Sequence, residues 1–267
     1  VSSGGQKTET SQTDLSAVLV DGLYANWKAG DMIMLVHDGQ TITVEARESG
    51  SISRLSSSVE GSFTDDNPLY GIFSTDGMVS YESITVTVPA IQTDGGNGYD
   101  AKTAVAVART VSNSLNFHTV CGGIKLNFQM PGVTKVELES VDGYTLSGAA
   151  NIKWDNQGVP IVDEIENANY ILVFSASDES GFTPGKDYYI STLPCDLYGG
   201  YRLSIYKDGL VAHYFGVHQT VERADYITPN DFMESGLEFD TPDAPLVEEE
   251  RPELDATTTA LLRRYQQ

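Results

Sequence analysis

Asp-Gly pairs between runs of β-branched and apolar residues constrain this sequence more than any other feature. A two-residue turn between antiparallel strands needs both turn residues at positive φ, which glycine adopts without strain and aspartate tolerates. Three such pairs occur, namely Asp38-Gly39 between 32–36 and 41–46, Asp142-Gly143 after 136–140, and Asp208-Gly209 between 203–207 and 210–217. We predict an antiparallel hairpin at each pair.

Alternation of apolar and polar residues indicates strands with one buried face. In ITVTV at 84–88 and IKLNFQM at 124–130 every second residue is apolar, which matches the period of two in a strand. The apolar run YILVFSA at 170–176 is typical of a central strand. Helical patterns are sparse: 101–111 fits a helix or a strand, and 253–267 offers a short helix. Many short strands without amphipathic helices predict an all-β protein built from antiparallel β-sandwiches.

The length and the polar stretches of the chain favour two domains. Its 267 residues exceed the roughly 100 to 150 residues of an ordinary domain. Polar residues at 109–116 separate two β-rich blocks, and after Phe239 prolines and carboxylates suit an extended linker. We predict a flexible leader over 1–14, β-sandwiches over 15–112 and 113–240, and an acidic linker and C-terminal tail over 241–267.

The charge of the chain argues against anionic partners. Its 38 acidic and 16 basic residues give a formal net charge of -22, which repels nucleic-acid phosphates and anionic lipid surfaces. We therefore expect no nucleic acid partner. The sequence has no run of about 18 apolar residues, the length of a membrane span, and it starts with the polar residues VSSGG. We expect an exported precursor to carry its signal peptide upstream of Val1.

The sequence has no residue spacing typical of a catalytic, cofactor or metal site. It contains neither an HExxH motif nor a GxSxG elbow, and its four histidines form no His-x-His pair. The loop 94–100 has an aspartate at each end, but its acids are too sparse for a calcium loop and favour a turn. GFTPGKDY at 181–188 lacks the spacing of a phosphate-binding loop and has Asp187 after its lysine. We expect no catalytic residue, no cofactor, no metal and no enzyme activity.

The stretch FHTVCGG at 117–123 places a histidine three residues before a cysteine. In an extended strand His118 and Cys121 point to opposite faces, so the imidazole cannot take the thiol proton directly. Cys121 is then either a buried free thiol or half of a disulfide with Cys195, the other cysteine of the chain. We expect Gly122-Gly123 to permit a bulge or a close backbone approach.

Five segments, in this order and spacing over about residues 15–235, resemble the fimbrillin (FimA/Mfa-like) family of Bacteroidales cell-surface fimbrial proteins. The segments are ANWKAGDMIMLV (25–36), ITVTVPAIQTDGGNGYD (84–100), FHTVCGGIKLNFQM (117–130), KVELESVDGYTLSG (135–148) and FTPGKDYYISTLP (182–194). The resemblance implies two tandem transthyretin-like β-sandwich domains.

The same resemblance implies export as a lipoprotein and a place at the outer membrane or in a fimbrium. The membrane would be reached only through a lipid anchor, and the partners would be other fimbrial subunits or further copies of the chain. In such pilins a strand of one subunit fills a groove in the next, which is β-strand addition. An arginine-directed protease often matures the subunit after an early strand, and Arg47 and Arg54 are the candidate cleavage sites here.

Two functions of different class follow from these observations. The first is a non-enzymatic fimbrial, pilin-like subunit or fimbrillin-like surface lipoprotein that contributes to adhesion. The alternative is a surface glycan-binding β-sandwich module, because aromatic side chains stack on sugars and Tyr198, Tyr201 and Tyr206 lie close together in the sequence. Strand alternation places Tyr201 in the core and Tyr206 on the opposite face. We expect a glycan or a protein on a host or bacterial surface as a further partner.

Overall fold

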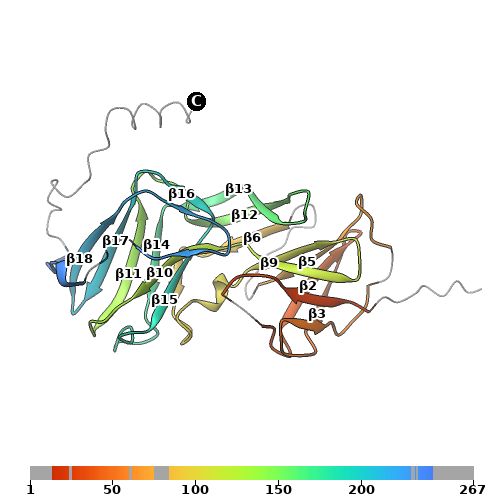
Figure 1. Ribbon diagram of the computed structural model, residues 1–267, viewed down its shortest axis with the longest axis horizontal. Coiled ribbons are helices and arrows are strands. Elements are labelled where there is room, and N and C mark those ends of the chain that lie inside the picture. The colour runs from red at the N-terminus through yellow and green to blue at the C-terminus, as the bar shows by residue number, and fades with distance from the viewer. Residues whose placement is uncertain are drawn as a thin grey trace, which may run out of the picture. The chain divides into compact units, whose positions relative to one another are not determined.

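The structure is a computed structural model that describes residues 14–23, 26–59, 62–74, 84–229, 232 and 234–242. Within these residues it contains strands and two short 3-10 helices, Ala101–Thr103 and Glu234–Gly236, and no α-helix (Figure 1). The all-β class predicted from the sequence is confirmed. The predicted leader and tail, with the helix expected at 253–267, fall outside the described residues except at positions 14, 241 and 242.

Two compact units, which alternate along the chain, make up the protein. Unit 1 comprises Val1–Thr87, Ala104–Val120 and Ala149–Ile165, and unit 2 comprises Val88–Thr103, Cys121–Gly148 and Glu166–Gln267. The sequence suggests instead one boundary after residue 112. The strands of unit 1 are β1 (Ser16–Leu19), β2 (Met32–His37), β3 (Gln40–Glu45), β4 (Ile52–Arg54), β5 (Leu69–Phe73), β6 (Ile84–Val88), β8 (Ala106–Thr110), β9 (Ser114–Thr119), β12 (Ser147–Trp154) and β13 (Pro160–Asn169), of which β6, β12 and β13 extend slightly beyond it.

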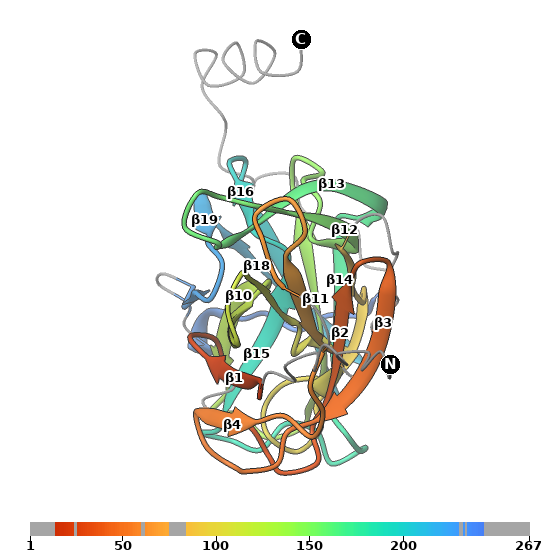
Figure 2. The ribbon, with the colours of Figure 1, turned by 90° about the vertical axis from the view of Figure 1, so that its right-hand side faces the viewer.

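Seven of these strands form one sheet in the order β3-β2-β5-β8-β9-β1-β4, in which β1 lies beside β4 (Figure 2). The predicted hairpin of β2 and β3 is confirmed, with Asp38 at φ 48° and Gly39 at φ 69°. The outer strands β3 and β4 are themselves joined just past their ends, where Ala46 and Leu55 form an antiparallel bridge. The sheet therefore curls back on itself and encloses its own core.

Trp27 lies at the centre of this core. Its ring makes edge contacts with Phe73 and Phe117, at centroid distances of 5.1 and 5.2 Å, and its indole N–H donates to the Ala17 carbonyl at 3.1 Å. The buried residues of the cluster are Leu15, Ala17, Leu19, Trp27, Ile33, Leu35, Val44, Ala46, Leu55, Leu69, Phe73, Ala104, Ala106, Ala108, Leu115 and Phe117.

A second sheet of unit 1 has the order β13-β12-β6. The buried residues Ile84, Val86 and Val88 of β6 alternate with more exposed threonines, as the sequence predicts. β12 and β13 are joined by a tight turn in which the Asp155 carboxylate accepts the N–H groups of Gln157 and Val159, both at 2.8 Å.

Unit 2 has a five-stranded sheet, β18-β17-β11-β14-β7, and a three-stranded sheet, β15-β10-β20, with the small pair β16-β19. Its strands are β7 (Ile91–Thr93), β10 (Gly122–Asn127), β11 (Val133–Ser140), β14 (Ile171–Ser175), β15 (Asp187–Thr192), β16 (Cys195–Leu197), β17 (Tyr201–Lys207), β18 (Leu210–Gly216), β19 (Gln219–Val221) and β20 (Tyr226–Ile227). Residues of both larger sheets share one core, which includes Leu126, Phe128, Leu138, Phe174 and Leu203.

Of the two hairpins predicted in unit 2, only one is present. Asp208-Gly209 joins the antiparallel strands β17 and β18 with φ values of 52° and 79°, as predicted. The hairpin predicted at Asp142-Gly143 is wrong: Gly143 has φ 72°, but β11 pairs with β14 and β17, while the next strand, β12, pairs in unit 1. An Asp-Gly pair specifies only the local turn, and tertiary packing decides which strand becomes the neighbour.

Residues 101–111, which fit either a helix or a strand by sequence, form a 3-10 turn and then strand β8. Two other details differ from the sequence prediction. Within the apolar run 170–176 the buried Leu172 and Phe174 alternate with the more exposed Ile171 and Val173, so β14 is not buried on both faces. Three pairs are parallel, β1 with β9, β10 with β20 and β14 with β7, so the sheets are mixed rather than wholly antiparallel.

A buried glutamine in unit 2 closes the edge of a sheet. The Gln92 side chain is 0% exposed, and its amide nitrogen donates to the carbonyls of Ser191 at 2.7 Å and of Pro89 at 3.1 Å. Its amide oxygen accepts the Ser191 N–H at 3.1 Å. The amide thus replaces a neighbouring strand at β15, which explains the Pro-x-x-Gln sequence after β6.

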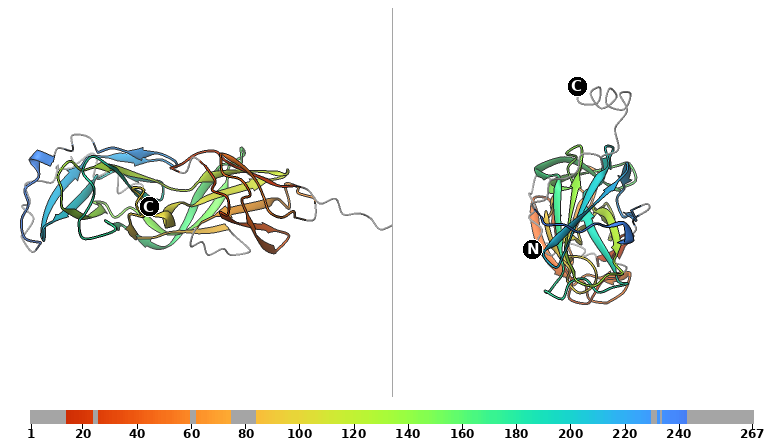
Figure 3. Two further views of the ribbon diagram at one scale, coloured as in Figure 1. Left: turned by 90° about the horizontal axis from the view of Figure 1, so that it is seen from below. Right: turned by 90° about the vertical axis from the view of Figure 1, so that its left-hand side faces the viewer.

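The described C-terminal residues pack on unit 2. Val211 of β18 exchanges backbone hydrogen bonds of 2.8 and 3.0 Å with Asp240. Figure 3 shows the last described part of the chain, in blue, alongside the strands of unit 2. The Glu234 carboxylate accepts the N–H of Met130 at 2.9 Å, and Phe239 packs against the core. The described residues up to Asp240 therefore belong to the fold of their own unit.

Candidate functional site

Strand β1, the first of the described strands, lies between two other strands of the seven-stranded sheet. It pairs parallel with β9 and antiparallel with β4, so it lies inside the curled sheet and not at an edge. Leu15, Ala17 and Leu19 are buried in the core, and the intervening Ser16 and Val18 are half-buried. Ala17 is a small residue between the larger Leu15 and Leu19, and its carbonyl oxygen accepts the hydrogen bond from the Trp27 indole.

Backbone hydrogen bonds hold β1 on both sides. The Ser16 and Val20 N–H groups donate to Asn113 and Phe117, and the Leu19 N–H donates to Ser51, all at 3.0 Å. Without β1 the sheet would have a gap one strand wide, with free backbone donors and acceptors on both walls. Such a gap is the kind of acceptor that an extended strand from another chain fills.

Asp21 fastens the chain immediately after β1. Its carboxylate accepts the Thr119 N–H at 2.7 Å and lies 2.9 Å from Nδ1 of His118, both at the end of β9. His118 is thus hydrogen-bonded to Asp21 and helps to hold the chain at the end of β1.

Arg47 and Arg54, the predicted cleavage sites, are exposed; Arg47 lies in the connection that follows β3, and Arg54 is the last residue of β4. The Arg47 N–H donates to the Arg54 carbonyl, and the Arg47 guanidinium donates to the Ser56 carbonyl, both at 2.9 Å. The Arg54 N–H and guanidinium donate to the Glu48 carboxylate, and these hydrogen bonds lower the pKa of Glu48. A protease therefore has to open hydrogen-bonded backbone to reach either site.

The segment that ends at Arg47 carries half of the buried core residues described for unit 1. Separating it after a cut would expose this apolar surface, at a cost of roughly 1.5–3 kcal/mol for each large side chain. A cut at either arginine therefore leaves the two fragments packed together, whereas displacement of β1 alone exposes three buried residues. The core residues before Arg47 are Leu15, Ala17, Leu19, Trp27, Ile33, Leu35, Val44 and Ala46.

The structure does not join Cys121 and Cys195, which are both free. Burial raises the pKa of Cys121 to about 12 and that of Cys195 to about 11, although a hydrogen bond from Thr192 opposes the second shift. Neither cysteine has the depressed pKa of a catalytic nucleophile. Gly122 and Gly123 confirm the expected close approach, because a Cβ on either one would clash with a backbone carbonyl of a neighbouring segment.

The loop 94–100 is held by its own hydrogen bonds. The Asp94 carboxylate accepts the N–H groups of Gly96 and Gly98 at 2.9 and 2.7 Å, and Lys186 of the GFTPGKDY segment lies 3.3 Å from it. The Asp100 carboxylate accepts the Thr93 N–H at 2.9 Å. Both aspartates stabilise a turn, and no group of three or more histidines, cysteines and acids suited to a metal occurs in the described part of the chain.

The tyrosines suggested as a sugar platform do not share a surface. Tyr201 is 1% exposed and belongs to the core. Tyr206 donates its hydroxyl to Glu137 at 2.8 Å and has the Lys135 ammonium 3.6 Å from its ring centroid. Tyr198 instead lies against His218, with the ring centroids 5.1 Å apart.

Comparison with known proteins shows the fold and no family. No family model and no curated protein sequence matches the chain. Among solved structures, a "putative cell adhesion protein" from Bacteroides ovatus has a TM-score of 0.56 at 14% identity, covering 87% of this chain and 96% of that one. A protein of the same description from Bacteroides uniformis has a TM-score of 0.52 at 13% identity, covering 88% and 97%. The likeness shows a shared fold. Within the described residues, no helix is long and apolar enough to span a membrane.

Proposed function

We propose that this protein is a non-enzymatic adhesion protein of the fimbrillin type, exported as a lipoprotein and displayed at the outer membrane or in a fimbrium. Three observations support the proposal: the ordered sequence motifs, the fold shared with two Bacteroides proteins described as putative cell adhesion proteins, and the strand β1. The position of β1 between β9 and β4 is the observation that supports assembly by β-strand addition.

In this proposal the protein joins another fimbrial subunit, or another copy of itself, by β-strand addition at the position of β1. The main chains of β9 and β4 supply the affinity, and the core positions filled by Leu15, Ala17 and Leu19 supply the specificity. A donor strand then needs a large, a small and a large apolar residue at every second position. The acidic, proline-containing segment after Phe239 lacks this pattern, so the donor comes from elsewhere in a partner.

Arg47 and Arg54 remain the proposed maturation sites, with a specific role. Cleavage at either arginine breaks the covalent connection between β1 and its neighbour β9, while core packing keeps the cut fragment in place. Exchange of β1 for a donor strand is then a separate step, which the incoming strand drives.

A reversible lock on β1 tests this proposal. Val18 and Ile52 are direct partners on β1 and β4, and replacing both by cysteine lets a disulfide tie the strand in place. The matched control is Met34→Cys with Thr43→Cys, a pair within the β2-β3 hairpin. Each variant is treated with an arginine-specific protease, and oligomers are scored on gels without boiling.

We expect the wild type and the control variant to form ladders, and the locked variant to form ladders only after reduction. A wild-type protein that stays strictly monomeric would contradict assembly. Ladders from the oxidised locked variant would show that β1 is not the strand exchanged. Antibody labelling of intact native cells tests surface display separately.

A further inference from the structure

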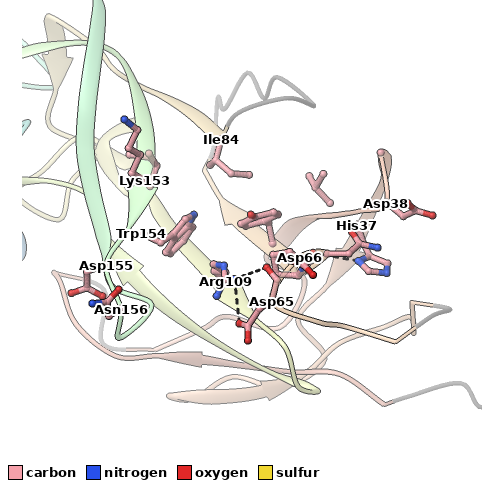
Figure 4. Close-up of a pocket in the computed structure, with 16 residues that line it drawn as sticks. His37, Asp38, Asp65, Asp66, Ile84, Arg109, Lys153, Trp154, Asp155 and Asn156 are labelled. Carbon is pink, nitrogen blue, oxygen red and sulfur yellow. Dashed lines mark hydrogen bonds and ion pairs between the residues drawn. The ribbon is translucent and has the colours of Figure 1, made fainter.

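Unit 1 contains an open cavity of about 830 Å³ that none of the sequence-predicted sites contributes to (Figure 4). The volume lies within the roughly 300–1,000 Å³ typical of ligand pockets. Its main lining side chains are His37, Asp38, Asp65, Asp66, Asn67, Tyr70, Arg109, Lys153, Trp154, Asp155 and Asn156.

The register of the curled sheet builds one wall of this pocket. Val36 pairs with Tyr70, and Tyr70 pairs with Arg109, so these residues of β2, β5 and β8 form a row on one face. Their neighbours Leu35, Leu69 and Ala108 point to the opposite face and fill the core. A polar and aromatic row therefore runs along the outside of a sheet whose inside is apolar.

The end of β12 supplies the facing wall. Trp154 is half-buried, and its ring centroid lies 6.1 Å from that of Tyr70 with an angle of 31° between the planes. In Figure 4 the Trp154 side chain points toward Arg109. A half-buried indole beside a tyrosine offers an apolar surface in a mainly polar pocket, as sites for amphipathic ligands do.

The polar groups around these rings are held in place. The Arg109 guanidinium donates to the Asp65 carbonyl at 3.1 Å and lies 3.5 Å from the Asp65 carboxylate, with 25% of its side chain exposed. Hydrogen bonds from the N–H groups of Val159, foremost, and Gln157 lower the pKa of Asp155 and keep it ionised at neutral pH. Fixed donors and acceptors next to an aromatic ring suit a ligand whose hydroxyls both donate and accept.

The charged residues of the lining indicate the charge of the ligand. Asp38, Asp65, Asp66 and Asp155 outnumber the cations Arg109 and Lys153, which disfavours an anionic ligand. The same lining also carries the cations Arg109 and Lys153, which repel an ammonium ligand, so fixed groups of both signs suit a neutral one. We propose that the cavity binds a neutral saccharide, stacked on Trp154 and Tyr70 and hydrogen-bonded by Arg109 and the surrounding carboxylates and amides. This site is distinct from β1, and the inference does not depend on strand addition.

Tryptophan fluorescence provides a direct measurement on the full chain. The protein has two tryptophans, and Trp27 is 1% exposed in the core. Quenching by acrylamide therefore reports mainly on Trp154. A glycan array of neutral and charged oligosaccharides identifies the probe, and we expect that the best neutral glycan protects the fluorescence from quenching and saturates with dose.

The decisive variant is Trp154→Ala. We expect it to weaken binding of the best neutral glycan, measured by calorimetry, by at least about tenfold, because a central aromatic anchor carries much of the affinity of a site. Tyr170→Ala removes an exposed aromatic ring of unit 2 and serves as the control, with unchanged affinity expected. An array without neutral hits, binding that prefers acidic or amino sugars, or full affinity in Trp154→Ala would each overturn the proposal. If the variant in which a disulfide locks β1 binds the glycan with full affinity, glycan binding does not depend on strand addition.

Discussion

Replacing Gln92 by methionine tests whether a side-chain amide closes the edge of β15. Methionine has a similar length and no hydrogen-bonding amide, so the change removes three hydrogen bonds without a large cavity. It leaves the N–H and carbonyl of Ser191 and the carbonyl of Pro89 without their partner. No solvent reaches the Gln92 side chain, which is 0% exposed, so water replaces these bonds only if the structure opens.

The magnitude follows from these lost bonds. An unsatisfied buried polar group costs roughly 1–3 kcal/mol, and the methionine recovers part of this by burying apolar surface. We expect the free energy of unfolding of unit 2 to fall by about 3–5 kcal/mol. Gln92→Glu should lower the free energy of unfolding more at about pH 8 than at about pH 5, because an ionised carboxylate cannot donate a hydrogen bond and burial favours its protonated form.

Urea unfolding provides the assay. Far-UV circular dichroism follows the strands of both units, while tryptophan fluorescence reports on unit 1, which holds Trp27 and Trp154. The control is Gln157→Met at the exposed β12-β13 turn, where the side chain is exposed and little change is expected. A loss below about 1 kcal/mol for Gln92→Met, or an equal loss in the control, would refute the reasoning.

Three further predictions follow from buried or closely packed groups. Gly122→Ala should destabilise unit 2 by about 3 kcal/mol, because its Cβ meets backbone that cannot move aside, whereas Gly236→Ala, with open space around it, should melt with the wild type. Thiol counting should find Cys121 and Cys195 slow to react in the native protein and two free thiols in denaturant without reductant; no free thiol would reveal a disulfide. Burial, aided by a neighbouring glutamate, raises the pKa of Tyr206 from 10.0 to about 12. The stability that the protonated Tyr206 side chain contributes is therefore complete below about pH 10 and is lost as the pH rises to about 12. Tyr206→Phe should make the fall of the unfolding free energy at alkaline pH shallower.

The sequence predicts those parts of this fold that depend on neighbouring residues. Asp38-Gly39 and Asp208-Gly209 have positive φ, and at each pair the next strand along the chain is also a direct neighbour in the sheet, so both hairpins follow from local chemistry. Asp142-Gly143 carries the same local information, yet β11 and β12 join different sheets. The parallel pairing of β1 with β9 depends on contacts between distant residues, and no local pattern indicates it.

The candidate sites differ in the same way. Tyr198, Tyr201 and Tyr206 are close in sequence, and the structure directs them to separate environments. Tyr70 and Trp154 are far apart in sequence and belong to different sheets, and the fold of unit 1 brings their rings together. The sequence offers one local indication of this pocket, which is Trp154 directly before the polar turn 155–158. A large aromatic residue beside a polar turn is not expected to serve the core alone.

The place of β1 in the curled sheet sets an order of events during folding. β1 is synthesised before β9, one of its two neighbours, which lies at residues 114–119, so the slot between β9 and β4 exists only after most of unit 1 has been synthesised. Until then the slot is open to any extended segment with the right side chains. The chain's own β1 has the advantage of tethering, which raises its effective concentration at the slot. In the proposed strand addition, competition between β1 and a foreign strand is therefore most even while unit 1 is still folding, and a subunit that meets a newly folding neighbour would join it without first having to break a finished sheet.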